Sequence, residues 1–125
     1  MGREIKFRAK RLDRDEWVYG NFVRIDDDYR IIEQEAHNNM VVDCQVVAET
    51  VGQFTGLHDK NGVEIYEGDI CTHESLPGAK NGLEVVFENM GYQIKGKMLS
   101  DDIILCDNSN RYITVIGNVH EGIKQ

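Results

Sequence analysis

Three cysteines and four histidines are the residues of this chain best suited to metal binding or to covalent chemistry. They are Cys44, Cys71, Cys106, His37, His58, His73 and His120. Zinc sites are usually built from close ligand pairs, Cys-x₂₋₄-Cys or His-x₃₋₅-His, and neither spacing occurs here. The nearest pair, Cys71 and His73, would share one face of a strand. The spacing predicts reduced, buried thiols and no metal or cofactor.

Catalysis by a cysteine would require a thiolate beside a histidine. Cys71 follows Ile70 at an apolar strand position, so we expect it to be buried. A second possibility is acid–base chemistry by the carboxylates of Glu64, Glu67 and Asp69, if one of them were desolvated. In a strand–turn–strand these groups would point to water. We therefore expect no catalytic residue and no enzymatic activity.

The segment Asp59-Lys60-Asn61-Gly62 predicts a hairpin turn with Gly62 in the left-handed region. A calcium loop is excluded because Gly62 comes too soon after Asp59 for that pattern. We expect Asp59 to accept hydrogen bonds from the backbone of its own turn. Asp69 is expected to brace the next turn in the same way. The predicted structural turn residues are Asp59, Asn61, Gly62, Gly68 and Asp69.

The formal net charge of −8 is unevenly distributed. The first 14 residues hold six basic and two acidic residues, whereas the rest hold 8 basic and 20 acidic residues. An acidic body repels nucleic acid, but the basic start could contact a phosphate backbone or an acidic partner. The alternative is an exposed strand face that pairs with the acidic body. The candidate contact residues are Arg3, Lys6, Arg8, Lys10 and Arg11.

Alternation of apolar and polar residues predicts many short antiparallel strands in this single 125-residue domain. Strands are expected at 5–10, 17–25, 29–33, 40–47, 51–57, 63–66, 70–72, 83–88, 92–99, 103–106 and 111–119. Gly20 marks a bulge or a close crossing. The loop at 73–82 would join lobes 1–72 and 83–125. The expected fold is mainly β, a small barrel or sandwich.

The expected core comprises Ile5, Phe7, Val51, Phe54, Ile65, Ile70, Val85, Phe87, Ile113, Val115 and Ile116. No run of the sequence approaches the roughly 18 apolar residues of a membrane span. The charged start also lacks the apolar core of a signal peptide. We therefore expect a cytoplasmic protein with no membrane partner.

Three blocks of the chain resemble the YopX family of small proteins encoded by bacteriophages and prophages. They are REIKFRA followed by WVYGNF, then ETVGQFTGLHDKNGVEIYEGDI, and finally VIGNVHE. The chain departs from the family at Ala48, where a proline is common, and in its tail after His120. The resemblance implies a mainly β protein with a barrel-like, SH3-like C-terminal lobe. It implies no catalytic residue.

The combined interpretation is a non-enzymatic module that binds another macromolecule in a bacterial cell. The expected partner is a host or phage protein, contacted through a sheet edge or the acidic surface, and a homo-oligomer is one way to cover an edge. The first alternative is an acidic mimic of nucleic acid that inhibits a host DNA-binding protein. The second is nucleic-acid binding through the basic N-terminal strand.

Overall fold

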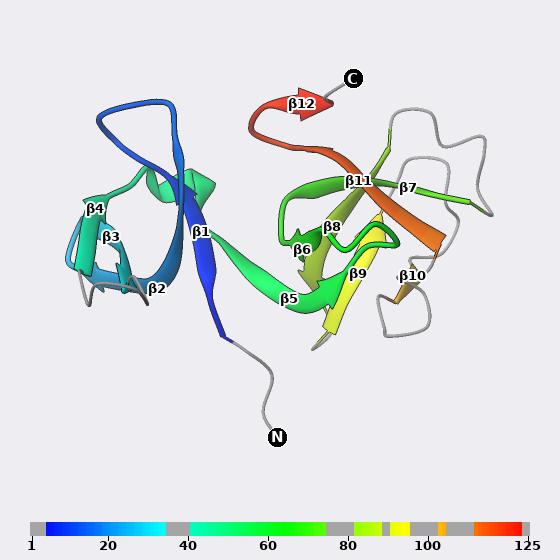
Figure 1. Ribbon diagram of the computed structural model, residues 1–125, viewed down its shortest axis with the longest axis horizontal. Helices are drawn as coiled ribbons and strands as arrows, with labels where there is room; N and C mark the ends of the chain where they lie inside the picture. Colours follow the sequence, from blue (N-terminus) through cyan, green and yellow to red (C-terminus); the bar gives the residue numbers. More distant parts are fainter. Residues whose placement is uncertain are drawn as a thin grey trace. The chain divides into compact units, whose positions relative to one another are not determined.

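The computed structural model is built almost entirely of β-strands, which confirms the mainly β prediction (Figure 1). The structure describes residues 5–34, 41–74, 82–88, 91–95, 103–104 and 112–123. The chain forms two compact units, Met1–Phe54 and Thr55–Gln125. The sequence suggested a lobe boundary at the loop 73–82, whereas these units divide within one strand, Gly52–His58.

The first unit is a curved antiparallel sheet with the strand order β4-β3-β2-β1-β5 (Figure 1). Its elements are β1 (Phe7–Lys10), β2 (Trp17–Ile25), β3 (Asp28–Gln34), β4 (Val41–Gln45), the short 3₁₀ helix η1 (Ala48–Thr50) and the start of β5 (Gly52–His58). The predicted strands of this region are all present. Polar residues 26–27 make the turn between β2 and β3, as their composition predicts.

Gly20 lies where β2 crosses closely over β3, which confirms the sequence interpretation. A Cβ atom at this position would collide with the carbonyl oxygen of Ile32. Only glycine lets the two backbones approach this closely. Register is kept on both sides of the crossing, because Phe7 faces Gly20 and Asn21 faces Ile32.

The second unit contains the sheet β10-β9-β8-β7-β11-β12 (Figure 1). Its elements are the end of β5 and β6 (Glu64–Tyr66), β7 (Asp69–His73), β8 (Leu83–Glu88), β9 (Gly91–Lys95), β10 (Ile103–Ile104), β11 (Ile113–Asn118) and β12 (Gly122–Ile123). The predicted hairpin of β8 and β9 is confirmed within the described residues. The sequence did not predict β12, which pairs with β11 after a turn. A bulge at Ile116 interrupts the pairing of β11 with β7.

Each unit has its own apolar core. In the first unit the buried cluster comprises Ala9, Val18, Ile31, Cys44 and Val46, with Phe7, Phe22, Tyr29, Val42 and Val51 packed against it. In the second it comprises Ile65, Cys71, Leu83, Val85, Tyr92, Ile94 and Ile113, with Leu57 and Val115 packed against it. Alternating residues of each strand supply these clusters, as the period-2 pattern requires.

The prediction of burial is wrong for two residues, Ile5 and Phe87. Ile5 is 67% exposed because β1 begins only at Phe7. Phe87 is 53% exposed because it lies one residue before the end of β8, at the margin of the buried cluster, where its ring makes an edge-on contact with Tyr92. Ile70 and Ile116 are half-buried and do not belong to either cluster among the described residues. The other predicted core residues are buried or packed against a cluster.

Candidate functional site

Basic residues in β1 and directly before it contact aromatic rings within the first unit. The Lys6 ammonium lies 5.1 Å from the Phe54 ring centroid. The Arg8 guanidinium lies 4.8 Å from the centroid of Trp17, and the Lys10 ammonium lies 5.7 Å from it. Such cation–π contacts are attractive by about 0.5–2 kcal/mol, depending on exposure. Arg8 is only 8% exposed, so its charge is largely withdrawn from the surface.

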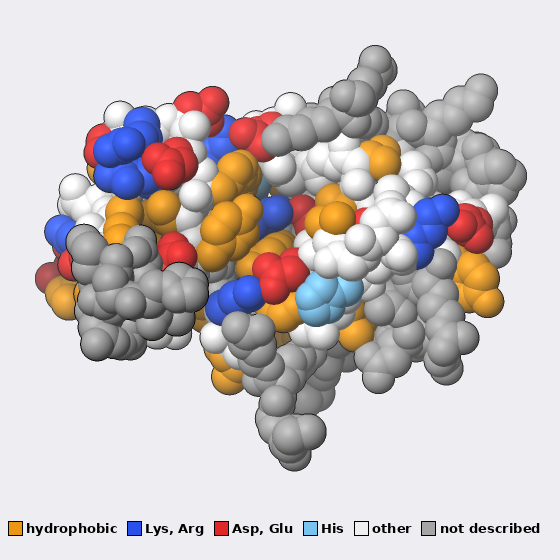
Figure 2. Space-filling model, in the orientation of Figure 1, with side chains coloured by type: hydrophobic (Ala, Val, Ile, Leu, Met, Phe, Trp, Pro, Cys, Tyr) orange, Lys and Arg blue, Asp and Glu red, His pale blue; other side chains and the backbone are white. Residues whose placement is uncertain are grey.

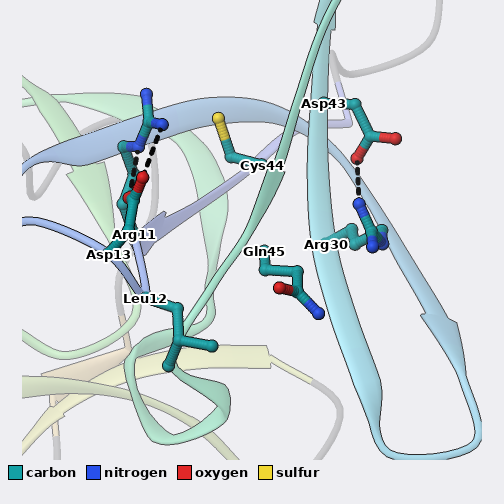
Figure 3. Close-up of a pocket in the computed structure, with 7 residues that line it drawn as sticks. All are labelled: Arg11, Leu12, Asp13, Arg30, Asp43, Cys44 and Gln45. Carbon is teal, nitrogen blue, oxygen red and sulfur yellow. Dashed lines mark hydrogen bonds and ion pairs between the residues drawn. The ribbon is translucent and has the colours of Figure 1, made fainter.

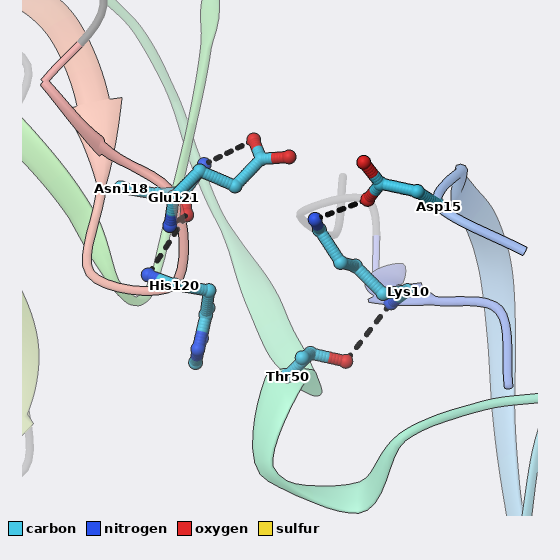
Figure 4. A network of polar contacts seen from close by, with 6 residues as sticks. All are labelled: Lys10, Asp15, Thr50, Asn118, His120 and Glu121. Carbon is cyan, nitrogen blue, oxygen red and sulfur yellow. Dashed lines mark hydrogen bonds and ion pairs between the residues drawn. The ribbon is translucent and has the colours of Figure 1, made fainter.

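The remaining basic candidates that the structure describes pair with carboxylates of the bend between β1 and β2. Lys10 Nζ donates to Asp15, while its backbone N–H donates to Thr50 Oγ1 at 2.9 Å (Figure 4). Arg11 donates to both oxygens of Asp13, at 2.9 and 3.1 Å. Figure 2 shows Lys and Arg side chains lying beside Asp and Glu side chains on this unit. Arg3 lies outside the described residues.

A pocket of about 370 Å³ opens at β4, the last strand of the first unit's sheet (Figure 3). This volume lies near the lower end of the range of small-ligand pockets. Figure 3 shows the Arg11–Asp13 pair on one side of β4 and the Arg30–Asp43 pair on the other. The lining residues are Arg11, Leu12, Asp13, Arg30, Asp43, Cys44 and Gln45.

One end of the β4 edge is closed by the chain that follows β1. The Leu12 N–H donates to the Gln45 carbonyl, and the Val47 N–H donates to the Lys10 carbonyl, both at 2.9 Å. Between them, Arg11 and Val46 form an antiparallel bridge. Beyond Leu12 the chain bends away, so the pairing ends at the Gln45 carbonyl.

The rest of the β4 edge presents its backbone outward. Val46 donates its N–H inward to the Tyr29 carbonyl, and the β3–β4 register is regular. Because backbone groups alternate in direction along an antiparallel strand, the N–H and C=O groups of Val41 and Asp43 face away from β3. Within the described ranges, no strand follows β4 on that side. Such an edge can accept another extended chain.

Arg30 forms hydrogen bonds with two aspartates on one side of the pocket. Its Nε donates to Asp28 Oδ2 at 2.8 Å and its Nη1 donates to Asp43 Oδ1 at 3.2 Å. Gln45 Nε2 donates to Asp28 Oδ1 at 3.1 Å. The hydrogen bond from Arg30, followed by that from Gln45, lowers the pKa of Asp28, and the bond to Asp28 raises the pKa of Arg30.

The Arg11–Asp13 pair behaves similarly on the other side of the pocket. The hydrogen bond from Arg11 lowers the pKa of Asp13, and the same bond raises the pKa of Arg11. Both pairs are solvated, so each contributes little to folding stability. The sequence pointed to Arg11 but missed Arg30, Asp43 and Gln45, because only the strand register brings these residues together.

The predicted structural turn at Asp59 is confirmed. Asp59 Oδ1 accepts the N–H groups of Asn61 and Val63 at 2.8 and 2.9 Å, and the Gly62 N–H donates to the Asp59 carbonyl. Gly62 has φ of 83°, in the left-handed region. The sequence did not predict that Asp59 Oδ2 also accepts the N–H of Val115 at 3.0 Å.

The second predicted turn is also confirmed. Asp69, which is 1% exposed, accepts the N–H of Tyr66 at 2.7 Å, and Gly68 has φ of 87°. A further turn follows β11, where Asn118 Oδ1 accepts the N–H groups of His120 and Glu121 at 2.9 Å each (Figure 4). The side-chain oxygens of Asp69 and Asn118 therefore accept hydrogen bonds from backbone N–H groups of their own turns.

Cys44 and Cys71 are free and buried. Burial, and then the nearby charges of Asp69 and Asp59, raises the pKa of Cys71, so this thiol stays protonated near neutral pH. His73 stacks on Tyr112 with ring centroids 5.9 Å apart. Cys106 lies outside the described residues.

In the part of the chain that the structure describes, no group of three or more His, Cys, Asp or Glu side chains could hold a metal ion. Nor does any helix there have the length and apolar character needed to cross a bilayer.

Comparison with known proteins gives a family match and a fold match. The model of the YopX protein family matches residues 6–123. The crystal structure of protein EF1440 from Enterococcus faecalis is similar, with a TM-score of 0.62 and 21% sequence identity over 95% of each chain. At this identity the similarity shows the fold alone. No functionally curated protein is similar in sequence to the chain.

Proposed function

The chain belongs to the YopX family, and we propose that it is a non-enzymatic module that binds an extended segment of another protein along the outer edge of β4. Binding of this kind adds one strand to a sheet. Main-chain hydrogen bonds supply affinity, and side-chain pockets beside the edge supply specificity.

The observation that carries the proposal is the combination of an outward-facing strand edge with an adjoining pocket. Val41 and Asp43 present backbone groups outward, and the pocket of about 370 Å³ lies at the same strand. Val41 is 59% exposed, so an apolar contact is available beside the backbone groups. Two added main-chain hydrogen bonds and the burial of one valine are together worth about 2–5 kcal/mol.

We place this module in the cytoplasm of a bacterium that carries a phage or prophage, with a host or phage protein as partner. The similarity to a protein of Enterococcus faecalis supports a bacterial setting. The buried free thiols Cys44 and Cys71 support a reducing compartment.

The test compares Val41→Pro with Val41→Ala. Proline removes the outward N–H while keeping an extended backbone, and it is tolerated at the first residue of an edge strand. Alanine removes the same side chain and keeps the N–H. The immobilised chain is offered a mixture of random octapeptides, and the retained peptides are quantified by mass spectrometry.

We expect Val41→Pro to reduce retention about tenfold relative to Val41→Ala, since one hydrogen bond and the fit of the added strand are lost. Circular dichroism checks that both variants fold. Equal retention by the two variants would show that peptides do not bind through the β4 edge.

A further inference from the structure

The open edge of β4 is blocked at one end. The strand runs from Val41 toward Gln45, and at Gln45 the edge is already occupied by Leu12. An added segment can lie beside Val41 and Asp43, but it cannot continue to Gln45, because Leu12 already lies there. The blocked end therefore favours a segment whose own chain terminates there.

The direction of the added segment decides which terminus reaches the blocked end. Every strand pairing that the structure describes is antiparallel. Antiparallel ladders are also slightly more stable per residue and more frequent than parallel ones. A segment antiparallel to β4 has its N-terminus beside Gln45, whereas only a parallel segment would bring its C-terminus there.

The hydrogen-bond pattern of β4 fits a first residue opposite Asp43 and a third residue opposite Val41. The position opposite Gln45 is taken by Leu12, whose N–H donates to the Gln45 carbonyl. The Asp43 carbonyl faces outward and can accept a hydrogen bond from an ammonium group, and the Asp43 N–H can donate to the carbonyl of the first residue. The Val41 N–H and C=O can pair with the third residue.

Charge favours the same terminus. Among the lining residues, Arg11 and Arg30 are balanced by Asp13 and Asp43, and Asp28, which is bonded to Arg30, adds a further negative charge. Asp43 Oδ1 accepts from Arg30, while Oδ2 accepts no hydrogen bond from any residue in the described ranges (Figure 3). An α-ammonium would neutralise the excess charge, whereas a C-terminal carboxylate would increase it.

We infer that the β4 edge captures the free N-terminus of a partner polypeptide, with its α-ammonium at the blocked end beside the Asp43 carbonyl and the carboxylates of Asp13 and Asp43. This inference rests on the proposed function, because it names the chemistry of the segment that the edge accepts. The partner would present an extended, unblocked N-terminal segment of at least three residues.

The test uses the full chain and random octapeptides in three forms: both ends free, N-terminally acetylated, and C-terminally amidated. We expect the free and amidated forms to be retained equally and acetylation to reduce retention at least tenfold. Equal retention of the acetylated form would overturn the inference. So would loss of retention on amidation, which would indicate parallel docking of a carboxylate toward Arg11 and Arg30.

The same experiment separates failure of the inference from failure of the proposed function. If no form is retained more strongly by the wild-type chain than by Val41→Pro, both are overturned. If all forms are retained equally and Val41→Pro releases them, only the inference is overturned.

A pair of matched variants examines the role of charge. Asp43→Asn removes the charge at the blocked end, and Asp27→Asn removes an equivalent charge from the exposed β2–β3 turn, outside the pocket lining. We expect Asp43→Asn to reduce the free-to-acetylated retention ratio about threefold or more and Asp27→Asn to leave it unchanged. An identical ratio in the two variants would contradict the placement of the ammonium beside Asp43.

Discussion

The two units use their aspartates in different ways. In the second unit, Asp59 and Asp69 are 5% and 1% exposed, and their carboxylates accept backbone N–H groups. In the first unit, Asp13, Asp28 and Asp43 are solvated and accept hydrogen bonds from arginine side chains. The same residue type therefore fixes the backbone in one unit and lines an open strand edge in the other.

This difference indicates where binding can occur. A buried carboxylate that satisfies backbone donors cannot change partners without leaving those donors unpaired, which costs about 1–3 kcal/mol for each. A solvated carboxylate paired with arginine can exchange partners at little cost. The carboxylates of the second unit thus stabilise its turns, whereas the solvated pairs beside β4 could exchange partners, as the proposed function requires.

The largest effect on stability is expected from Asp59→Ala. The change leaves the N–H groups of Asn61, Val63 and Val115 without their acceptor, and we expect a loss of about 3–5 kcal/mol in the free energy of unfolding. Asp43→Ala, its solvated counterpart in the first unit, should cost less than about 1 kcal/mol. Urea denaturation measures both. Equal losses in the two variants would remove the distinction between the units.

A smaller effect is expected at Gly62. A Cβ at this position would meet no atom within 4 Å, so any penalty arises from the positive φ of 83° alone. Gly62→Val should therefore cost about 1–2 kcal/mol, and Gly62→Asn, which tolerates this conformation, less than about 1 kcal/mol. Thermal or urea unfolding measures the difference. Wild-type stability of the valine variant would show that the turn adopts another backbone conformation.

The comparison also explains which features could be predicted from the sequence. The turns at Gly62 and Gly68 were predictable because turn chemistry is local, with Asp59 and Asn61 only two residues apart. The bond from Val115 to Asp59 was not, because it joins residues 56 apart in the chain. Local turn chemistry fixes which backbone donors a side chain reaches, but not what packs against the turn from a distant strand.

The pocket beside β4 was unpredictable for the same reason. Arg11 follows β1, Arg30 lies in β3 and Asp43 lies in β4, so their proximity depends on a register that the sequence pattern does not specify. Alternation identified the faces of the strands but not where a core ends. Phe87 therefore has the right spacing in β8 and nevertheless lies outside the buried cluster.

Thiol labelling provides a third comparison of the units, in a Cys106→Ser background. Burial raises the pKa of Cys71, which is 0% exposed, so we expect no labelling by iodoacetamide at pH 8 until the chain unfolds. Cys44 lines the pocket, and we expect it to react at least tenfold faster in the folded chain. Mass spectrometry of the modified peptides distinguishes the two sites. Equal rates would show that the pocket does not give access to Cys44.

The smallest expected effect concerns the pH dependence of the solvated pairs. Hydrogen bonds from Arg11 and Arg30 lower the pKa values of Asp13 and Asp28, so both carboxyls should titrate below the ordinary value of about 3.9. A lowered pKa in the folded state means that the stabilising contribution is present above the ordinary value and is lost as the pH falls through the folded value. Carbonyl-detected NMR titration measures each carboxyl. We expect Arg11→Gln to return the pKa of Asp13 to its ordinary value and to leave that of Asp28 lowered, because the two pairs lie on opposite sides of β4 (Figure 3). A joint shift of both carboxyls would instead show that the two sides of the pocket are electrostatically coupled.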